Sequence, residues 1–187
     1  YYGVSGTWSE RAYNEACKIS KRENIMNDFY NNSFSLLYND LPSRLNIPKD
    51  ADFLYLCSNE TVNGIEFRNN GIQYPSREEL GNTKLIVDMS SDFLMKKIKW
   101  DNIDMAFACT SKNMGIAGAN VVILRNDILS NMKYNSNSAI PCILDWKLYA
   151  DTYSLYNTPA TFNFYVFDYI LDNYIDEMKN INQIDEY

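Results

Sequence analysis

The chain of 187 residues carries 17 basic and 24 acidic side chains, which give a formal charge of −7 and a pI near 4.6. This balance argues against nucleic acid or an anionic membrane surface as the main partner, because both attract basic proteins. A hydrophobic fraction of 46% and a charged fraction of 22% are typical of one globular domain or part of a larger one. Because the first residue is Tyr1 rather than Met, we expect that an N-terminal portion precedes it.

Histidine is absent from the sequence. The chain alone therefore cannot supply a Ser-His-Asp or Cys-His nucleophile pair, an HExxH zinc site or a Cys2His2 finger. Its cysteines show no CxxC spacing, so we expect no metal site and predict reduced thiols in a cytoplasmic protein. Acid–base or covalent chemistry must then rest on Lys, Asp, Glu, Tyr or Cys, or on a bound cofactor. The cysteines are Cys17, Cys57, Cys109 and Cys142.

The first predicted element is a helix. Thr7-Trp8-Ser9-Glu10 has the S/T-x-x-E form of a capping box, which opens an amphipathic helix through about Lys21. Its apolar face is expected to carry Ala12, Ala16 and Ile19, which follow helical spacing.

Four short apolar runs come next and are expected to be strands buried on both faces, as in α/β sheets. We therefore assign the chain to the α/β class with a mainly parallel sheet. The runs are Phe53–Cys57, Lys84–Val87, Met105–Cys109 and Asn120–Leu124.

The last third of the chain predicts a short helix over residues 126–132 and a longer one from about 161 to 178. Asp168, Asp172 and Asp176 recur at i, i+4 spacing along the longer helix and are interpreted as a solvated face.

Ligands of such sheets bind outside the carboxyl ends of the strands. Asp88 directly follows the second apolar run, and Lys112 follows the third, with Gly115 and Gly118 behind it. Each has an ordinary explanation by itself: Asp88 as a helix cap and Lys112 as a surface lysine. Together on one rim they favour pyridoxal phosphate, which needs a lysine for its Schiff base and an acid for its pyridine nitrogen.

The residues around these positions resemble phosphoserine aminotransferases, which are fold-type I pyridoxal-phosphate enzymes of the class V aminotransferase group. The resemblance covers nearly the whole chain. It is carried by Gly6-Thr7-Trp8-Ser9, by residues 57–67 (CSNETVNGIEF), by residues 87–91 (VDMSS), by residues 111–118 (SKNMGIAG) and by residues 155–162 (LYNTPATF).

The resemblance implies a role for each matching residue. Lys112 would form the Schiff base and act as general base and acid on the substrate Cα. Asp88 would pair with the pyridinium N–H, Thr61 would hydrogen-bond the phenolic oxygen, and Trp8 would stack on the ring. The alternative for Trp8 is a plain core aromatic.

Asn157 and Thr158 resemble residues that reach the cofactor phosphate of the neighbouring subunit in a homodimer, although a helix cap before Pro159 also explains them. Ser111 stands where family members carry a Gln that helps to hold the phosphate, and Ala160 replaces a second Pro. Ser111 is expected to weaken phosphate binding rather than to remove the chemistry, and the change at Ala160 is expected to be mild.

The resemblance also implies the wider architecture. Residues 1–178 would be the central part of the large domain, with a mainly parallel, seven-stranded type of sheet and flanking helices. Residues 179–187 would start the connection to a C-terminal small domain. The phosphate-binding glycine turn would precede Tyr1.

Two functions follow for the chain. The first is transamination of 3-phosphohydroxypyruvate with L-glutamate to O-phospho-L-serine and 2-oxoglutarate in L-serine biosynthesis, with amino-acid and 2-oxo-acid substrates. The second is a degenerate, non-catalytic aminotransferase-like scaffold, which Ser111 favours and the matching Lys112 opposes.

Overall fold

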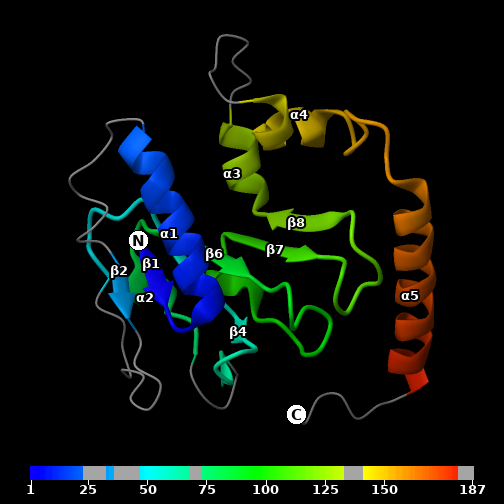
Figure 1. The fold of residues 1–187 in the computed structure, drawn as a ribbon, viewed down its shortest axis with the longest axis horizontal. Helices are drawn as coiled ribbons and strands as arrows, with labels where there is room; N and C mark the ends of the chain where they lie inside the picture. Colours follow the sequence, from blue (N-terminus) through cyan, green and yellow to red (C-terminus); the bar gives the residue numbers. More distant parts are fainter. Residues whose placement is uncertain (23–32, 36–46, 68–72, 133–140, 181–187) are drawn as a thin grey trace.

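The computed structural model describes residues 1–22, 33–35, 47–67, 73–132 and 141–180, and these form a sheet flanked by helices (Figure 1). The sheet has six strands in the order β2-β1-β3-β6-β7-β8. They are β1 (Tyr2–Val4), β2 (Ser33–Ser35), β3 (Phe53–Cys57), β6 (Lys84–Asp88), β7 (Met105–Cys109) and β8 (Asn120–Leu124). A separate two-stranded ribbon pairs β4 (Asn59–Glu60) with β5 (Ile65–Glu66).

The helices are α1 (Thr7–Arg22), α2 (Arg77–Leu80), α3 (Asn126–Asn131), α4 (Trp146–Asp151) and α5 (Thr161–Asn180), with 3-10 turns at Trp100–Asn102 and Cys142–Leu144. In the described part of the chain, none of them is long and apolar enough to cross a membrane. The predicted short helix after the fourth strand and the long helix from Thr161 are confirmed as α3 and α5. The expected domain boundary at residue 178 falls inside α5 and stays a prediction.

All neighbouring strands of the six-stranded sheet are parallel except β7 and β8, which confirms the mainly parallel α/β class. The described residues contribute one strand fewer than the seven-stranded type that the resemblance implies. Cys57 of β3 pairs in register with Asp88 of β6, and Asp88 pairs with Phe107 of β7. The carboxyl ends of these three strands therefore lie at one edge.

The core sits around the central strands. Leu54, Leu56, Leu85 and Val87 are fully buried in β3 and β6, and Ala106 of β7 is 1% exposed. Three of the four apolar runs thus have the predicted burial, because helices and loops cover both sides of a parallel sheet.

The prediction is wrong for the fourth run. Strand β8 runs antiparallel to β7 at the end of the sheet, and its Val122 and Ile123 side chains are 45% and 36% exposed. An antiparallel strand can leave surface open to water, whereas a parallel strand inside an α/β sheet is covered on both faces.

Helix α1 packs against β1 and β3. Its buried face differs from the predicted one: Cys17 is 6% exposed, whereas Ile19 is 65% exposed. Ala12 and Ala16 are half-buried, as is Tyr13, so the inward face is turned slightly from the expected stripe.

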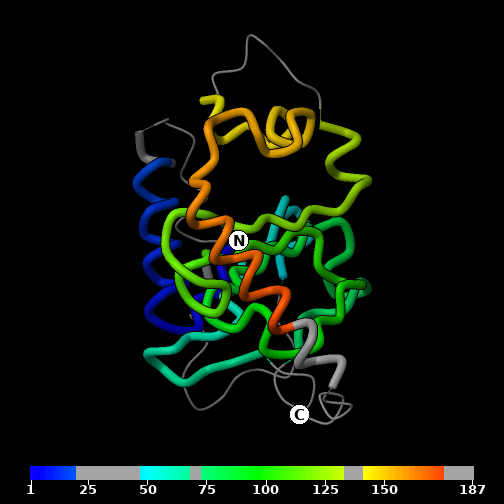
Figure 2. The backbone as a smooth tube through the Cα atoms, turned by 90° about the vertical axis from the view of Figure 1, so that its right-hand side faces the viewer, coloured from blue at the N-terminus to red at the C-terminus, as the bar shows by residue number. Residues whose placement is uncertain are grey.

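Helix α5 lies at the opposite end of the molecule from α1 (Figure 1), and it faces the viewer in Figure 2. Asn163 donates to the Ala117 carbonyl and Tyr174 to the Leu94 carbonyl, so two loops at the sheet edge hold the helix. Asp168 and Asp172 are exposed, as expected for a solvated face, and the side chain of Asp176 lies outside the described residues.

Candidate functional site

The polar segments that follow β3, β6 and β7 are joined to one another. The Ser58 N–H donates to the Asp88 carbonyl at 2.9 Å, and the Ser91 hydroxyl donates to the Asn59 carbonyl at 3.0 Å. The Asn113 side chain, from the loop after β7, donates to the Ser91 carbonyl at 3.2 Å. The expectation that the Asp88 and Lys112 segments share one rim is therefore confirmed.

Three of the predicted site residues meet on this rim. The Trp8 indole N–H donates to the Thr61 hydroxyl at 3.0 Å, which joins the start of α1 to the end of β4. The Lys112 ammonium lies 5.4 Å from the centroid of the Trp8 ring. This cation–π distance brings together residues from positions 8, 61 and 112 of the chain.

The Lys112 ammonium has no carboxylate partner among the residues that the structure describes, and its side chain is exposed. Lys96, on the preceding loop, is different: its ammonium lies 2.9 Å from Glu66 and 2.8 Å from Asp92, with a further bond of 2.7 Å to the Phe67 carbonyl. Among the described residues, the Lys112 ammonium thus contacts only an aromatic ring, whereas Lys96 is held by two carboxylates.

The loop that carries Lys112 is closed by its own hydrogen bonds. The Thr110 hydroxyl contacts the Ile116 carbonyl at 2.6 Å, and Met114 is 1% exposed. Gly115 and Gly118 have φ angles of 131° and 128°, which side-chain-bearing residues rarely adopt. Their missing side chains also let α5 approach, since a Cβ on Gly115 would lie 3.1 Å from a Val166 methyl group.

Asp88 ends β6 and keeps free acceptor capacity. One carboxylate oxygen accepts the Ser90 N–H at 2.9 Å, and the other accepts the Tyr55 hydroxyl at 3.3 Å. Burial first, and the Asp88 charge second, raise the pKa of Tyr55, so its phenol stays protonated as a donor. A carboxylate has about four lone-pair sites, and two are used here.

Cys57, at the end of β3, is a poor nucleophile candidate. All four thiols of the chain are free, in agreement with the prediction. Burial, followed by the charges of Glu60 and Asp88, raises the pKa of the Cys57 thiol, which therefore stays protonated. Ser111 is exposed beside Lys112, and its hydroxyl donates to the Cys109 sulfur at 3.2 Å.

Asn157 and Thr158 are not brought into this group. They lie in the exposed segment between α4 and α5, beyond the β8 edge of the sheet from α1 and β4 (Figure 1). The Asn157 amide donates to the Tyr149 hydroxyl at 2.7 Å, and within the described residues neither side chain hydrogen-bonds to Trp8 or Lys112.

The structure adds two residues that the sequence reasoning missed. The capping-box prediction is wrong, because the Glu10 N–H donates to the Gly6 carbonyl at 3.0 Å and the cap of α1 comes from far along the chain. The Glu60 carboxylate accepts the Trp8 and Ser9 N–H groups at 2.8 and 2.7 Å. Asn63 accepts the Thr7 N–H at 2.8 Å. The available signal was a glutamate in the polar segment that follows the buried strand β3.

The comparisons with known proteins agree with this geometry. A family model described as aminotransferase class-V matches residues 26–187. Phosphoserine aminotransferase from Campylobacter jejuni is 33% identical over 171 residues, which are 91% of this chain and 43% of that protein. The chain therefore spans less than half the length of this curated relative.

Two solved structures are also similar. A phosphoserine aminotransferase from Bacillus circulans has a TM-score of 0.73 and 29% identity, over 94% of this chain and 45% of that one. The pyridoxal-phosphate-bound phosphoserine aminotransferase from Trichomonas vaginalis has a TM-score of 0.69 and 32% identity, over 94% of this chain and 48% of that one. By its family match, this chain belongs to the class-V aminotransferases.

Proposed function

We propose that the intact protein is a pyridoxal-phosphate-dependent transaminase that converts 3-phosphohydroxypyruvate and L-glutamate to O-phospho-L-serine and 2-oxoglutarate. The observation that carries the proposal is the Lys112 ammonium over the Trp8 ring, on the same rim as Asp88 and without a carboxylate partner among the described residues. The names of the relatives support the substrate pair, and the residues of the rim support the cofactor.

The donors and acceptors of the rim fit pyridoxal phosphate. The Thr61 oxygen accepts the Trp8 indole N–H, which leaves its own hydroxyl hydrogen to donate to a ring oxygen. Asp88 keeps lone pairs for a protonated ring nitrogen, and Lys112 offers an amine to an aldehyde. Trp8 provides a planar aromatic surface, so amine, acid, hydroxyl and stacking surface converge from separate elements.

Bound pyridoxal phosphate supplies an electron sink for the carbanion formed at the substrate α-carbon. The chain supplies the proton chemistry and the fixed charges. Lys112 acts as the general base that takes the proton from the α-carbon and as the general acid that returns it on the product side. Asp88 holds a negative charge at the strand end, where it stabilises a protonated ring nitrogen, and Tyr55 keeps that carboxylate oriented.

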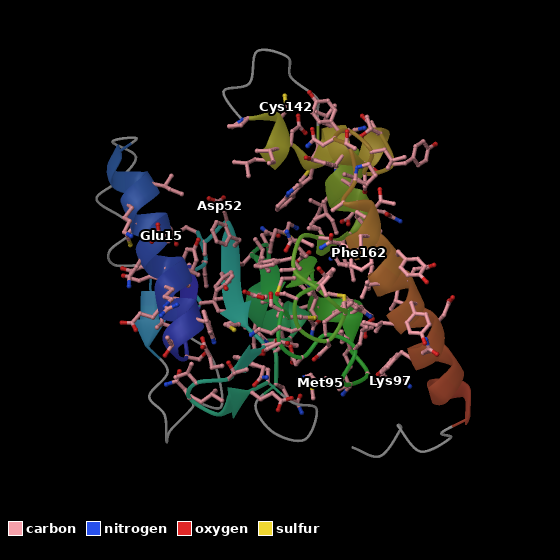
Figure 3. The ribbon with its side chains drawn as sticks, turned by 45° about the vertical axis from the view of Figure 1, so that its right-hand side comes forward. Glu15, Asp52, Met95, Lys97, Cys142 and Phe162 are labelled. Atoms are coloured by element: carbon pink, nitrogen blue, oxygen red, sulfur yellow. The ribbon has the colours of Figure 1, made fainter. Side chains whose placement is uncertain are left out.

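We also propose a homodimer in which Asn157 and Thr158 serve the partner's site. Both side chains are exposed and lie away from their own rim, and exposed aromatic residues lie in the same segment and on helix α5, which follows it. Tyr153, Phe162 and Tyr165 are 89%, 67% and 65% exposed, and Figure 3 shows Phe162 at the α5 side of the molecule, opposite Glu15 on α1. Large exposed apolar areas mark interaction surfaces.

The proposal extends to the setting of the protein. Residues 1–178 are assigned to the central part of the cofactor-binding large domain and 179–187 to the start of the connection to a small domain. Serine biosynthesis in the cytoplasm fits the free thiols.

The test is borohydride reduction of the intact protein with pyridoxal phosphate, followed by peptide mapping and an assay of glutamate-dependent formation of O-phospho-L-serine. We expect a pyridoxyl label on Lys112 and activity with this substrate pair. A label on Lys96, Lys97 or Lys99 contradicts the assignment of the lysine. Cofactor binding or labelling without turnover of any amino acid favours the alternative of a non-catalytic aminotransferase-like scaffold, which the serine at position 111 also favours.

A further inference from the structure

The turn between β4 and β5 is bonded to the start of α1 by side chains that the proposed cofactor contacts do not use. The first N–H groups of a helix have no partner inside the helix. Here those of Thr7, Trp8 and Ser9 all donate to Glu60 or Asn63 of this turn, at 2.7 to 2.8 Å. The cap of α1 is thus supplied by residues 51 to 56 positions away.

Glu60 is 0% exposed, and no basic side chain forms an ion pair with it in the described ranges. Its charge is balanced by the two N–H groups and by the positive end of the α1 dipole. A local Ser, Thr or Asp is sufficient to cap a helix. A buried glutamate from another element does more, because it also fixes where the helix begins relative to that element.

The start of α1 lies in close contact with the side chains of Glu60 and Asn63. A Cβ on Gly6 would lie 2.8 Å from the Glu60 side chain and 2.5 Å from the Asn63 oxygen, so only glycine fits there. On the other side, the Asn63 and Gly64 N–H groups donate to the Glu60 carbonyl at 3.0 and 2.8 Å and fold the turn around it. The helix start and the turn therefore form one unit.

Two proposed cofactor contacts belong to this unit. Trp8 is a residue whose N–H Glu60 accepts, and Thr61 is the residue after Glu60. We propose that Glu60 is a positioning residue, which holds the Trp8 indole against the Thr61 hydroxyl and beside the Lys112 ammonium for the cofactor ring. This inference rests on the proposed function for its ligand, but the placement of Trp8 is testable without ligand.

The first measurement is the dissociation constant of pyridoxal phosphate in a double-mutant cycle of Glu60→Gln and Trp8→Phe. Gln keeps the shape of Glu60 but replaces one accepting oxygen with an NH2 group, which cannot accept an N–H. Glu60→Gln is expected to weaken binding about tenfold, and to add less than about twofold once Trp8 is already Phe. If the two substitutions act independently, their fold-changes in the dissociation constant multiply, and that result overturns the proposal.

The matched control is Glu79→Gln. Glu79 also belongs to a helix cap, since its carboxylate accepts the Ser76 N–H at 2.8 Å at the start of α2. Glu79→Gln is expected to leave the dissociation constant unchanged, even where it lowers the melting temperature as much as Glu60→Gln does. Equal weakening by both variants means a general loss of stability and contradicts a positioning role.

The second measurement is made without cofactor. Trp100→Phe and Trp146→Phe leave Trp8 as the only tryptophan of this chain, which has three; any tryptophan outside it is replaced in the same way. Glu60→Gln should shift the Trp8 emission to longer wavelength and raise its quenching by iodide, whereas Glu79→Gln should change neither. An unchanged Trp8 signal overturns the proposal.

If Glu60→Gln does not fold, Asn63→Ala takes its place in both measurements, because it removes the Thr7 acceptor and keeps the buried charge. The experiments distinguish failure of the proposed function from failure of the positioning role of Glu60. A wild-type protein that binds no pyridoxal phosphate defeats the proposed function, while the fluorescence of Trp8 still decides whether Glu60 positions it.

Discussion

Two aspartates lie at opposite ends of the neighbouring parallel strands β6 and β7 and differ in how many partners their carboxylates have. Asp104, just before β7, is 1% exposed and accepts bonds from Arg77 and Arg125, all at 3.0 Å, and from the Leu85 N–H at 2.8 Å. Asp88, at the end of β6, has a backbone N–H and a tyrosine hydroxyl but no basic partner among the described residues. The saturated charge holds the fold together, and the unsaturated one is available to a ligand.

The lysines repeat this contrast. Lys96 is 19% exposed at its side chain and is held by Glu66 and Asp92, whereas Lys112 contacts an aromatic ring. A buried charge is kept where partners offset its desolvation. The candidate site therefore differs from the rest of the sheet in its charged side chains, which have no ion-pair partner among the described residues. These side chains share the rim with hydroxyl and acceptor groups that can still form hydrogen bonds. Substitutions at these aspartates and lysines test this difference between paired and unpaired charges in the described ranges.

Lys112→Ala should abolish turnover and leave the stability of the fold unchanged, because no carboxylate in the described ranges pairs with this lysine. Lys96→Ala is the matched variant: it should destabilise the protein but leave borohydride labelling at Lys112. The measurements are the transamination assay, urea unfolding and peptide mapping on both proteins. An active Lys112→Ala protein would show that Lys112 is not the catalytic lysine.

Asp88→Asn should leave the fold nearly intact and remove about 3 kcal/mol or more of transition-state stabilisation, which lowers kcat/KM at least about 100-fold. A neutral amide cannot stabilise a protonated ring nitrogen as a carboxylate does. Steady-state kinetics and a melting curve measure the two quantities on the same preparation. Near wild-type turnover would show that Asp88, like Asp104, is structural.

Asp104→Ala should have the opposite profile. It leaves the Leu85 N–H without its acceptor and removes a shared partner from two arginines, at a cost of about 2–3 kcal/mol in the free energy of unfolding. Water recovers part of the loss, since the two arginine side chains are 35% and 41% exposed.

Asp127→Ala is the control for that stability measurement. Asp127 also pairs with Arg125, at 2.7 Å, but its side chain is 55% exposed, so its substitution should lower the stability much less than Asp104→Ala does. Urea midpoints at constant slope give both values. A large loss of cofactor affinity in folded Asp104→Ala protein would contradict a purely structural role for Asp104.

How much of this was accessible from the sequence depends on the range of each contact. The apolar runs of β3, β6 and β7 and the polar residues after them are local patterns, and they predicted the rim with Asp88 and Lys112. The cap of α1 was misassigned because Thr7 and Glu10 match a local motif, while the true acceptors Glu60 and Asn63 lie more than 50 residues away.

The same limit explains the error at β8. An apolar run shows that a segment is a strand but carries no signal for its direction or for what covers its faces. Val122 and Ile123 look as apolar as Leu54 and Leu56, yet only the second pair is enclosed. The resemblance supplied the residues that spacing alone could not, including Trp8 and Thr61.

The exposed segment with Asn157 and Thr158 extends the comparison to a second subunit. Lys112→Ala protein mixed with Asn157→Ala/Thr158→Ala protein should recover activity after subunit exchange. One site of each heterodimer then has both halves intact, so equal mixing restores about a quarter of wild-type activity. No recovery despite demonstrated exchange shows that each site is built within one chain.

The smallest expected effect concerns Ser111, whose hydroxyl is directed to the Cys109 sulfur. A Gln side chain is about two carbons longer and can carry an amide N–H to a phosphate oxygen, where Ser needs a bridging water that is almost as good enthalpically. Ser111→Gln should therefore tighten pyridoxal-phosphate binding by about 0.5–2 kcal/mol, which is at most about thirtyfold, with little change in turnover.

The measurement for Ser111 is the dissociation rate of the cofactor under dilution, since excess cofactor hides such a difference in an ordinary assay. Ser111→Ala is the control, and it should release the cofactor at least as fast as the wild type because it removes the hydroxyl without adding reach. Weaker binding by Ser111→Gln would place Ser111 in a rearranged phosphate site, in which the serine and Cys109 act together and the longer side chain displaces a contact. The rim would then differ from its relatives in the position of the phosphate, while Lys112 and Asp88 keep the roles that their unused charges indicate.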